Sequence, residues 1–171
     1  MAALAAILSF VELPIFPMAP YLKYDPSLVP SMVTGFAYGA GPGVLVGIVA
    51  ALIHGLITSN WIGAAINILV TIFFIAPAAL VYKKKHTLIG GILGLILGVI
   101  LAMAAAILGN ATIALSAYYG GDIHALLPII LPILVPFNLM KGGLNSILTI
   151  IIYKTISNLI TPAKEQVKGK Q

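Results

Sequence analysis

The sequence predicts an all-α integral membrane protein with six transmembrane helices and a proline-rich external loop between the first two. Hydrophobic residues make up 61% of the 171 residues and charged residues only 8%, with a mean hydropathy of +1.13. A soluble domain of this size could not hide so much apolar surface. Clusters of proline, glycine and charge divide the apolar residues into six segments. No hydrophilic stretch is long enough for a second domain, so we expect a single membrane domain over residues 1–171.

The first expected helix covers about residues 1–13. It is short for a span, which needs about 20 residues. It also lacks the basic leader and the processing site of a signal peptide, so we expect a retained helix. Residues 12–30 follow with five prolines, which is typical of an ordered loop. Within this loop Asp25 precedes Pro26, a pair that suits a helix N-cap and the first helical position.

Five more helices are expected, over approximately residues 27–38, 43–57, 61–82, 87–118 and 126–159. The glycine-rich run 39–43 separates the first two of these, and the basic run 83–86 closes the third. A break is expected near Gly109 and Asn110, and three prolines should bend the first half of the last helix. A polar tail, residues 160–171, completes the chain.

The distribution of lysines predicts the orientation, because basic loops stay in the cytoplasm. Seven of the nine lysines lie in the 83–85 loop or from residue 154 onward. We therefore expect a multi-pass protein of the cell membrane with both termini in the cytoplasm. The loop 12–30 and the turns 58–61 and 118–124 should then lie outside the cell.

Lys141 is the residue most informative about function, because it is the only charged side chain between Asp122 and Lys154. An ionisable group at membrane depth costs about 2.5–3.5 kcal/mol and usually faces a cavity, a partner or a ligand. No acidic residue lies within any apolar segment. We therefore interpret the amine as meeting a bound ligand and not a protein anion.

Asparagines accompany this lysine on one helical face. Asn138, Lys141 and Asn145 are spaced i, i+3 and i+7, so they can line one wall. Their donors and acceptors suit a ligand edge rich in carbonyl oxygens and ring nitrogens. Hydrogen bonding to neighbouring helices is the alternative, and for Asn145 and Asn67 we favour it.

Small residues recur every fourth position in the fifth segment. This row predicts close helix packing and consists of Gly90, Gly94, Gly98, Ala102 and Ala106, with Asn110 next. Ala2 and Ala6 form a similar pair near the N-terminus. For that pair, spacing alone leaves open whether it packs within the chain or docks another subunit.

Several function classes find no support in the sequence. Cysteine is absent, the three histidines are scattered and no Ser, His or acidic cluster has catalytic spacing, so we expect neither a metal site nor an enzyme. The glycine-rich run 39–43 lacks the ending of a phosphate loop. The net charge of +5 reflects the lysine bias and does not indicate nucleic-acid binding.

Five stretches of the chain resemble the substrate-binding S components of energy-coupling factor (ECF) vitamin transporters, and specifically the riboflavin-binding type. They are residues 13–17, 20–30, 39–43, 77–85 and 136–146. The Lys-Tyr-Asp-Pro run at 23–26 and the Phe-Asn-Leu-Met-Lys run at 137–141 are the most specific parts. The resemblance spans nearly the whole chain.

The resemblance implies a six-helix protein of a prokaryotic membrane that binds a vitamin, here riboflavin, from outside and needs no cofactor. Polar contacts to the flavin would come from Asn110, Asn138 and Lys141. Loop residues Tyr21, Leu22, Lys23 and Tyr24 would cover the ligand. Ala2 and Ala6 match the AxxxA motif that contacts the transmembrane coupling subunit. Two cytoplasmic ATPases would supply energy while the S component reorients to release the vitamin.

Two alternatives stay open. Related S components bind other vitamins, so the ligand could differ while the protein class holds. An autonomous ion-coupled carrier is the other alternative. It would need an intramembrane acid or a stripe of polar residues along a pore, and the apolar segments contain neither.

Overall fold

The computed structural model describes residues 1–17, 19, 22–118 and 120–160. Within these residues the fold is helical throughout, with one isolated β-bridge between Leu13 and Tyr24. Two of the elements are π-helical and continue the helices before them. In chain order the elements are α1 (Ala2–Leu8), α2 (Leu28–Tyr38), α3 (Ala40–Thr58), α4 (Trp61–Lys84), α5 (Leu88–Gly109), η1 (Asn110–Ala114), α6 (Leu115–Tyr118), α7 (Ile123–Ile129), η2 (Ile130–Leu134) and α8 (Val135–Ile160).

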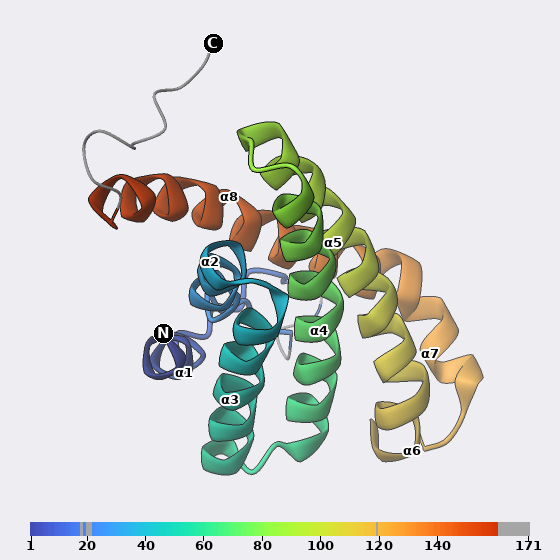
Figure 1. Cartoon of the computed structure of the whole chain (residues 1–171). Helices are drawn as coiled ribbons and strands as arrows, with labels where there is room; N and C mark the ends of the chain where they lie inside the picture. The colour runs from blue at the N-terminus through green and yellow to red at the C-terminus, as the bar shows by residue number, and fades with distance from the viewer. Residues whose placement is uncertain (18, 20–21, 119, 161–171) are drawn as a thin grey trace.

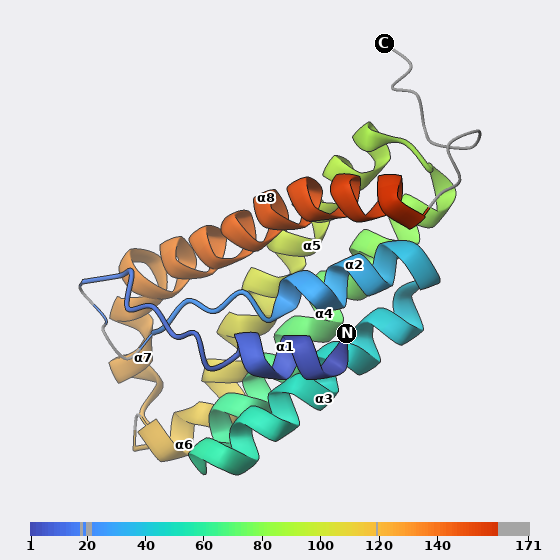
Figure 2. The same cartoon turned by 90° about the vertical axis from the view of Figure 1, so that its left-hand side faces the viewer.

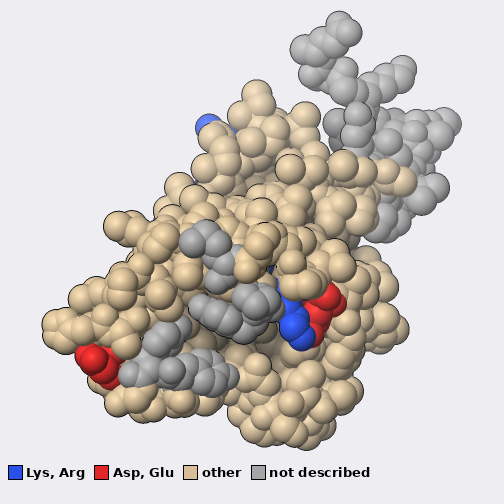
Figure 3. Space-filling view, turned by 180° about the vertical axis from the view of Figure 1, so that it is seen from behind, with Lys and Arg blue, Asp and Glu red and all other residues tan. Residues whose placement is uncertain are grey.

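Four helical stretches in the described residues are long and apolar enough to cross a membrane. They are Ala40–Thr58, Trp61–Lys84, Leu88–Ala117 and Ile123–Tyr153, and α2 is a shorter apolar helix. The face in Figure 3 carries charged atoms at only a few places, as expected for a surface in contact with lipid. The all-helical membrane fold is therefore confirmed, whereas α1 and α2 are shorter than a spanning helix.

Three expected features differ in the structure. The first helix ends at Leu8 and not near residue 13. The helix after the proline-rich loop begins at Leu28 with Ser27 as its N-cap, so Asp25 and Pro26 precede it. In the glycine-rich run, only Gly39 is non-helical. Its φ of 99° suits glycine, and α3 begins directly after it.

Close backbone packing holds the helices together where glycines meet neighbours. An added Cβ at Gly94 would lie 2.6 Å from the carbonyl oxygen of Ala78, and one at Gly98 would lie 2.5 Å from that of Phe74. The row of small residues on α5 thus packs against α4, as its spacing predicted. The buried core beside this contact contains Met32 of α2, together with Phe74 and Ile75 of α4.

The turns fall at two opposite ends of the bundle. Figures 1 and 2 both place the α4–α5 turn and the end of α8 at one end, and the α3–α4 and α6–α7 turns at the other. The segment between α1 and α2 runs beside the start of α8 in Figure 2, where Phe16 contacts Phe137 and Asp25 pairs with Lys141. Backbone hydrogen bonds of 2.8 Å in both directions join Leu13 to Tyr24 and hold this segment as a paired loop.

Candidate binding chamber

A cavity of about 650 Å³ lies between the 9–27 segment and the helices α3, α4, α5 and α8. This volume falls within the range of small-molecule sites, about 300–1,000 Å³. Twelve polar or charged residues line it, and apolar residues and glycines make up the rest. The twelve are Ser9, Glu12, Lys23, Asp25, Ser27, His54, Asn60, Asn67, Thr71, Asn110, Asn138 and Lys141.

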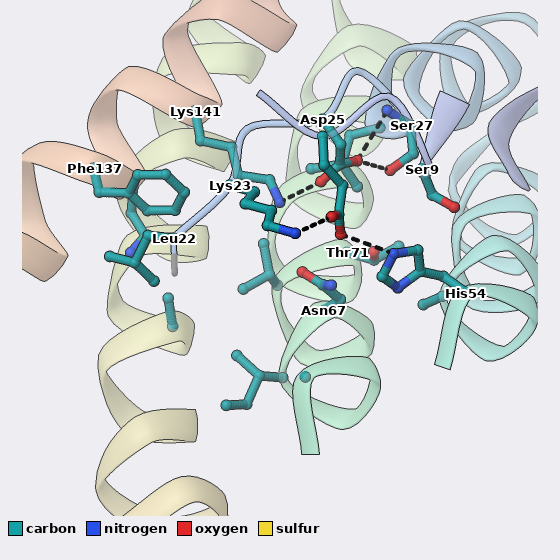
Figure 4. Close-up of a pocket in the computed structure, with 18 of the residues that line it drawn as sticks. Ser9, Leu22, Lys23, Asp25, Ser27, His54, Asn67, Thr71, Phe137 and Lys141 are labelled. Atoms are coloured by element: carbon teal, nitrogen blue, oxygen red, sulfur yellow. Dashed lines mark hydrogen bonds and ion pairs between the residues drawn. The ribbon is translucent and has the colours of Figure 1, made fainter. Parts of the chain in front are cut away.

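Lys141 projects from α8 to the chamber and pairs with an acidic residue (Figure 4). Its Nζ lies 2.8 Å from Oδ2 of Asp25, and both side chains are nearly buried, at 11% and 12% exposure. The expectation that this lysine has no protein anion is therefore wrong. Asp25 comes from the loop before α2 and not from an apolar segment, so the composition of the apolar segments does not reveal it.

Asp25 is fixed from two sides. Its Oδ1 accepts hydrogen bonds from the backbone N–H and the hydroxyl of Ser27, and its Oδ2 accepts one from Lys141. Burial opposes the charged carboxylate, but the ammonium and these hydrogen bonds outweigh it and hold the pKa of Asp25 below its usual range. The pair therefore ties the loop to α8 at the chamber wall.

Asn145 lies one turn after Lys141 on α8 and supports the same contact between the loop and α8. Its Nδ2 donates to the backbone oxygens of Lys141, at 3.0 Å, and Asp25, at 3.3 Å. Its Oδ1 and the hydroxyl of Thr149 are buried without a protein partner among the described residues. Asn145 thus supports its own helix and the loop, and does not bond to a neighbouring helix as expected, whereas Asn67 lines the chamber.

The amides of Asn110 and Asn138 come from two helices beside π-helical turns. Asn110 begins η1, and Asn138 follows η2 by one turn of α8. Each Nδ2 donates at 2.8 Å to a backbone oxygen four residues earlier, Ala106 and Leu134 respectively. The second N–H and the oxygen of each amide have no protein partner in the described part of the chain, so they are available to a ligand. π-Helical turns occur often at functional sites.

A second charged group, centred on Glu12, lies beside Asp25, because the Leu13–Tyr24 bridge brings residues 12 and 25 next to each other. Its Oε2 pairs with Lys23 of the same loop, and its Oε1 lies 3.1 Å from Nε2 of His54 on α3. Figure 4 shows His54 on one side of the chamber and Phe137 on the other. Neither Glu12 nor His54 was expected at the site, because 42 residues separate them and no short spacing links them.

The expected loop residues divide into two groups. Leu22 and Lys23 line the chamber. Tyr24 is 6% exposed, its backbone pairs with Leu13 and it does not line the cavity, so its expected contact with a ligand finds no support in this geometry. Tyr21 lies outside the described residues.

The alanine pair of α1 lies away from the chamber. Ala2 is partly exposed, whereas Ala6 is 6% exposed and packs with Ala5 against Ala50 of α3. The outward positions of α1 belong to Leu4 and Ile7. Ala6 therefore packs within the chain, and a docking role for Ala2 and Ala6 stays a prediction.

The arrangement is suited to binding and not to metal chemistry. No group of three His, Asp or Glu side chains in the described residues could hold a metal ion. The chamber offers the remaining N–H and the oxygen of Asn110 and Asn138, an ammonium held by a carboxylate, and walls that combine apolar and polar residues. The fold and the chamber define a membrane-embedded binding protein for a small molecule with polar edges.

Comparison with known proteins identifies the family. The model of the ECF transporter substrate-specific component matches residues 1–153, so this chain belongs to that family. The chain is 30% identical to the riboflavin transporter RibU of Staphylococcus aureus (strain TCH60), over 94% of this chain and 88% of the relative. It is 25% identical to the riboflavin transporter FmnP of Bacillus subtilis (strain 168), over 90% and 86% respectively.

A solved structure is similar over nearly the whole fold. It is described as the S component of a bacterial ECF transporter, with a TM-score of 0.81 and 30% identity, covering 94% of this chain and 93% of that one. The resemblance seen in the sequence is confirmed. The family is a transport component of a membrane, so the expectation that the chain is not an enzyme is confirmed as well.

Proposed function

We propose that this chain is the high-affinity riboflavin-binding subunit of an ECF-type importer. The supporting observation is that Asn110, Asn138 and Lys141, from two different helices, line one chamber of suitable volume. Riboflavin has an apolar dimethylbenzene end, a pyrimidine edge of carbonyls and ring nitrogens, and a hydroxylated chain. Such a molecule needs a mostly apolar cavity with a few placed donors. The names of the relatives favour the same ligand.

In this proposal the pyrimidine edge meets the two amides and the ammonium. Asn110 and Asn138 can each donate one N–H and accept at one oxygen, and Lys141 can donate to a carbonyl while it keeps Asp25. Leu22 and Lys23 would cover the ligand from the loop. The Asp25–Lys141 pair then joins this loop to the helix that holds the flavin.

In the proposed transport cycle the chamber is accessible from outside the cell when the vitamin binds. The end that carries Lys83, Lys84 and Lys85 would face the cytoplasm, together with both termini. A transmembrane coupling subunit and two cytoplasmic ATPases would drive reorientation and release. The first helix, with Ala2 and Ala6, remains the proposed contact with the coupling subunit. Because Ala6 is buried against α3, the outward side chains Leu4 and Ile7 would meet the subunit first.

Riboflavin binding is tested by quenching of flavin fluorescence with the purified chain in detergent. Lys141→Met should weaken binding about 10- to 150-fold, since a hydrogen bond to a charged group contributes about 1.5–3 kcal/mol. Lys83→Met is the matched control, because that exposed lysine lies in the last turn of α4 and does not line the chamber. Unchanged affinity in the Lys141 variant would show that the ammonium does not contact the flavin.

Dependence on the ATPases is tested separately by uptake into vesicles. Reconstituted chain with the coupling subunit and ATPases should accumulate labelled riboflavin when ATP is present, and the chain alone should bind without accumulating it. Accumulation by the chain alone, driven by an ion gradient, would favour the autonomous carrier instead.

A further inference from the structure

Helix α4 brings two polar side chains to the chamber that the proposed contacts to the pyrimidine edge leave unused. Asn67 and Thr71 lie one helical turn apart on α4, and both line the cavity. Figure 4 shows them among the lining side chains, on a helix separate from the one that carries Lys141. Their spacing gives them one common face, so they can act on the same part of a ligand.

Packing places this polar pair on the side of α4 that lies next to α3. A Cβ added at Gly47 of α3 would lie 2.5 Å from Cγ2 of Thr71. Toward α5, in contrast, the chamber side of α4 is apolar. There Ile66 packs against Gly109, whose added Cβ would lie 3.2 Å from Cγ1 of Ile66, and Asn110 follows directly on that helix. Thr71 and Asn110 are thus at different sides of the chamber face of α4.

The helices α4 and α8 also form different walls. α4 packs against α2, α3 and α5, whereas α8 packs against α2 and α5. The two approach each other near their C-terminal ends, where the hydroxyl oxygens of Tyr82 and Tyr153 lie 3.2 Å apart. The chamber lies between the earlier parts of both helices, so Asn138 and Lys141 line a wall separate from that of α4.

Both polar groups on α4 are available to a ligand. Within the described residues no hydrogen bond engages the amide of Asn67 or the hydroxyl of Thr71, although Thr71 is only 1% exposed. An apolar part of a ligand placed against them would leave these groups without partners, which is unfavourable. Hydroxyl groups would satisfy them, because a hydroxyl both donates and accepts a hydrogen bond.

We propose that Asn67 and Thr71 bind the hydroxylated chain of the flavin, an inference that rests on the proposed function. The pyrimidine edge engages the donors of α5 and α8, so the chain is the polar part of the ligand that remains for α4. Residues one turn apart are separated by about 6 Å along a helix, which lets the two side chains engage different hydroxyls of the chain.

The test compares riboflavin with lumiflavin, which has the same ring system and a methyl group in place of the hydroxylated chain. Dissociation constants are measured for the unaltered chain and for Asn67→Leu, which nearly keeps the volume of the side chain and removes its polar atoms. The variant should bind riboflavin about tenfold more weakly and lumiflavin within about twofold of the unaltered chain, since only riboflavin loses hydrogen bonds. Thr71→Val keeps the shape that packs against Gly47 and should weaken riboflavin alone, by about threefold.

Thr112→Val is the matched control. Its exposed hydroxyl donates to the backbone oxygen of Leu108 and does not line the chamber, so both affinities should stay unchanged. Unchanged riboflavin affinity in both Asn67→Leu and Thr71→Val would overturn the proposal. Equal weakening of riboflavin and lumiflavin would overturn it as well, because the ring and not the chain would then lie at α4. Failure of riboflavin to bind the unaltered chain would instead refute the proposed function.

Discussion

The Asp25–Lys141 pair provides a quantitative test of how the chamber is built. The two charged atoms lie 2.8 Å apart and the side chains are only 12% and 11% exposed, so the pair is a buried one. Removing one member of a buried pair leaves an uncompensated charge and costs about 3–5 kcal/mol, whereas replacing both members is often nearly neutral. Asp25→Asn and Lys141→Met should therefore each destabilise the fold by about 3–5 kcal/mol.

The double variant should recover most of that loss. The asparagine introduced in place of Asp25 can still accept from Ser27 through its amide oxygen, and methionine fills nearly the volume of the lysine stem. The assay is the free energy of unfolding in detergent micelles without ligand, for the unaltered chain, both single variants and the double variant. The expected coupling energy is about 3 kcal/mol or more, which is the large end of the range for contacting residues.

Binding should not follow stability in this series. The double variant lacks the ammonium, so it should fold well and still bind riboflavin as weakly as Lys141→Met alone. If the losses of the two single variants simply add, the carboxylate and the amine do not depend on each other, and the reasoning is refuted. If the stable double variant binds riboflavin normally, Lys141 has a structural role only.

Three further predictions concern stability, each measured as unfolding in detergent. Gly43→Ala should destabilise by about 1–3 kcal/mol, because the new Cβ would lie 2.6 Å from backbone atoms of α2, whereas Gly41→Ala meets open space and should stabilise slightly. Thr149→Val should stabilise by about 1 kcal/mol, since the buried hydroxyl has no protein partner in the described residues, and Thr34→Val should destabilise because its hydroxyl donates to a backbone oxygen. The lowered pKa of Asp25 stabilises the fold above the unfolded-state pKa, about 3.9, and this contribution should vanish as pH falls through the lower folded-state pKa. The free energy of unfolding of Asp25→Asn should lack this loss at acid pH. An equal loss in both proteins would contradict its assignment to Asp25.

The helical membrane fold could be predicted from composition, because long apolar runs leave the backbone few other ways to satisfy its hydrogen bonds in lipid. The packing of Gly94 and Gly98 on α4 also followed from their spacing. Helix ends were harder, since the short α1 ends at Leu8 although Phe10 and Val11 continue the apolar character of the segment. Nothing in that local composition marks the end.

The chamber could be predicted only on the side built from one helix. Asn138 and Lys141 share a helical face, so their common wall follows from spacing. The partners Asp25 and Glu12 lie on a loop, and their contacts join residues 116 and 42 positions apart. Local spacing does not indicate these contacts, because the loop brings its acidic groups to the helices only when the chain has folded. The expectation that an ammonium in an apolar bundle faces a cavity agrees with the position of Lys141, but its carboxylate partner comes from the tertiary structure, so the expectation of no protein anion was wrong.

The identity of the molecule that occupies the chamber is the central question. The direct measurement is the absorption spectrum of the chain purified from cells supplied with riboflavin, followed by mass analysis of the ligand released on denaturation. We expect the flavin absorption bands and about one riboflavin released per chain. A colourless protein that releases a different vitamin, or that takes up no riboflavin when it is added, would contradict the assignment of this chamber to a flavin.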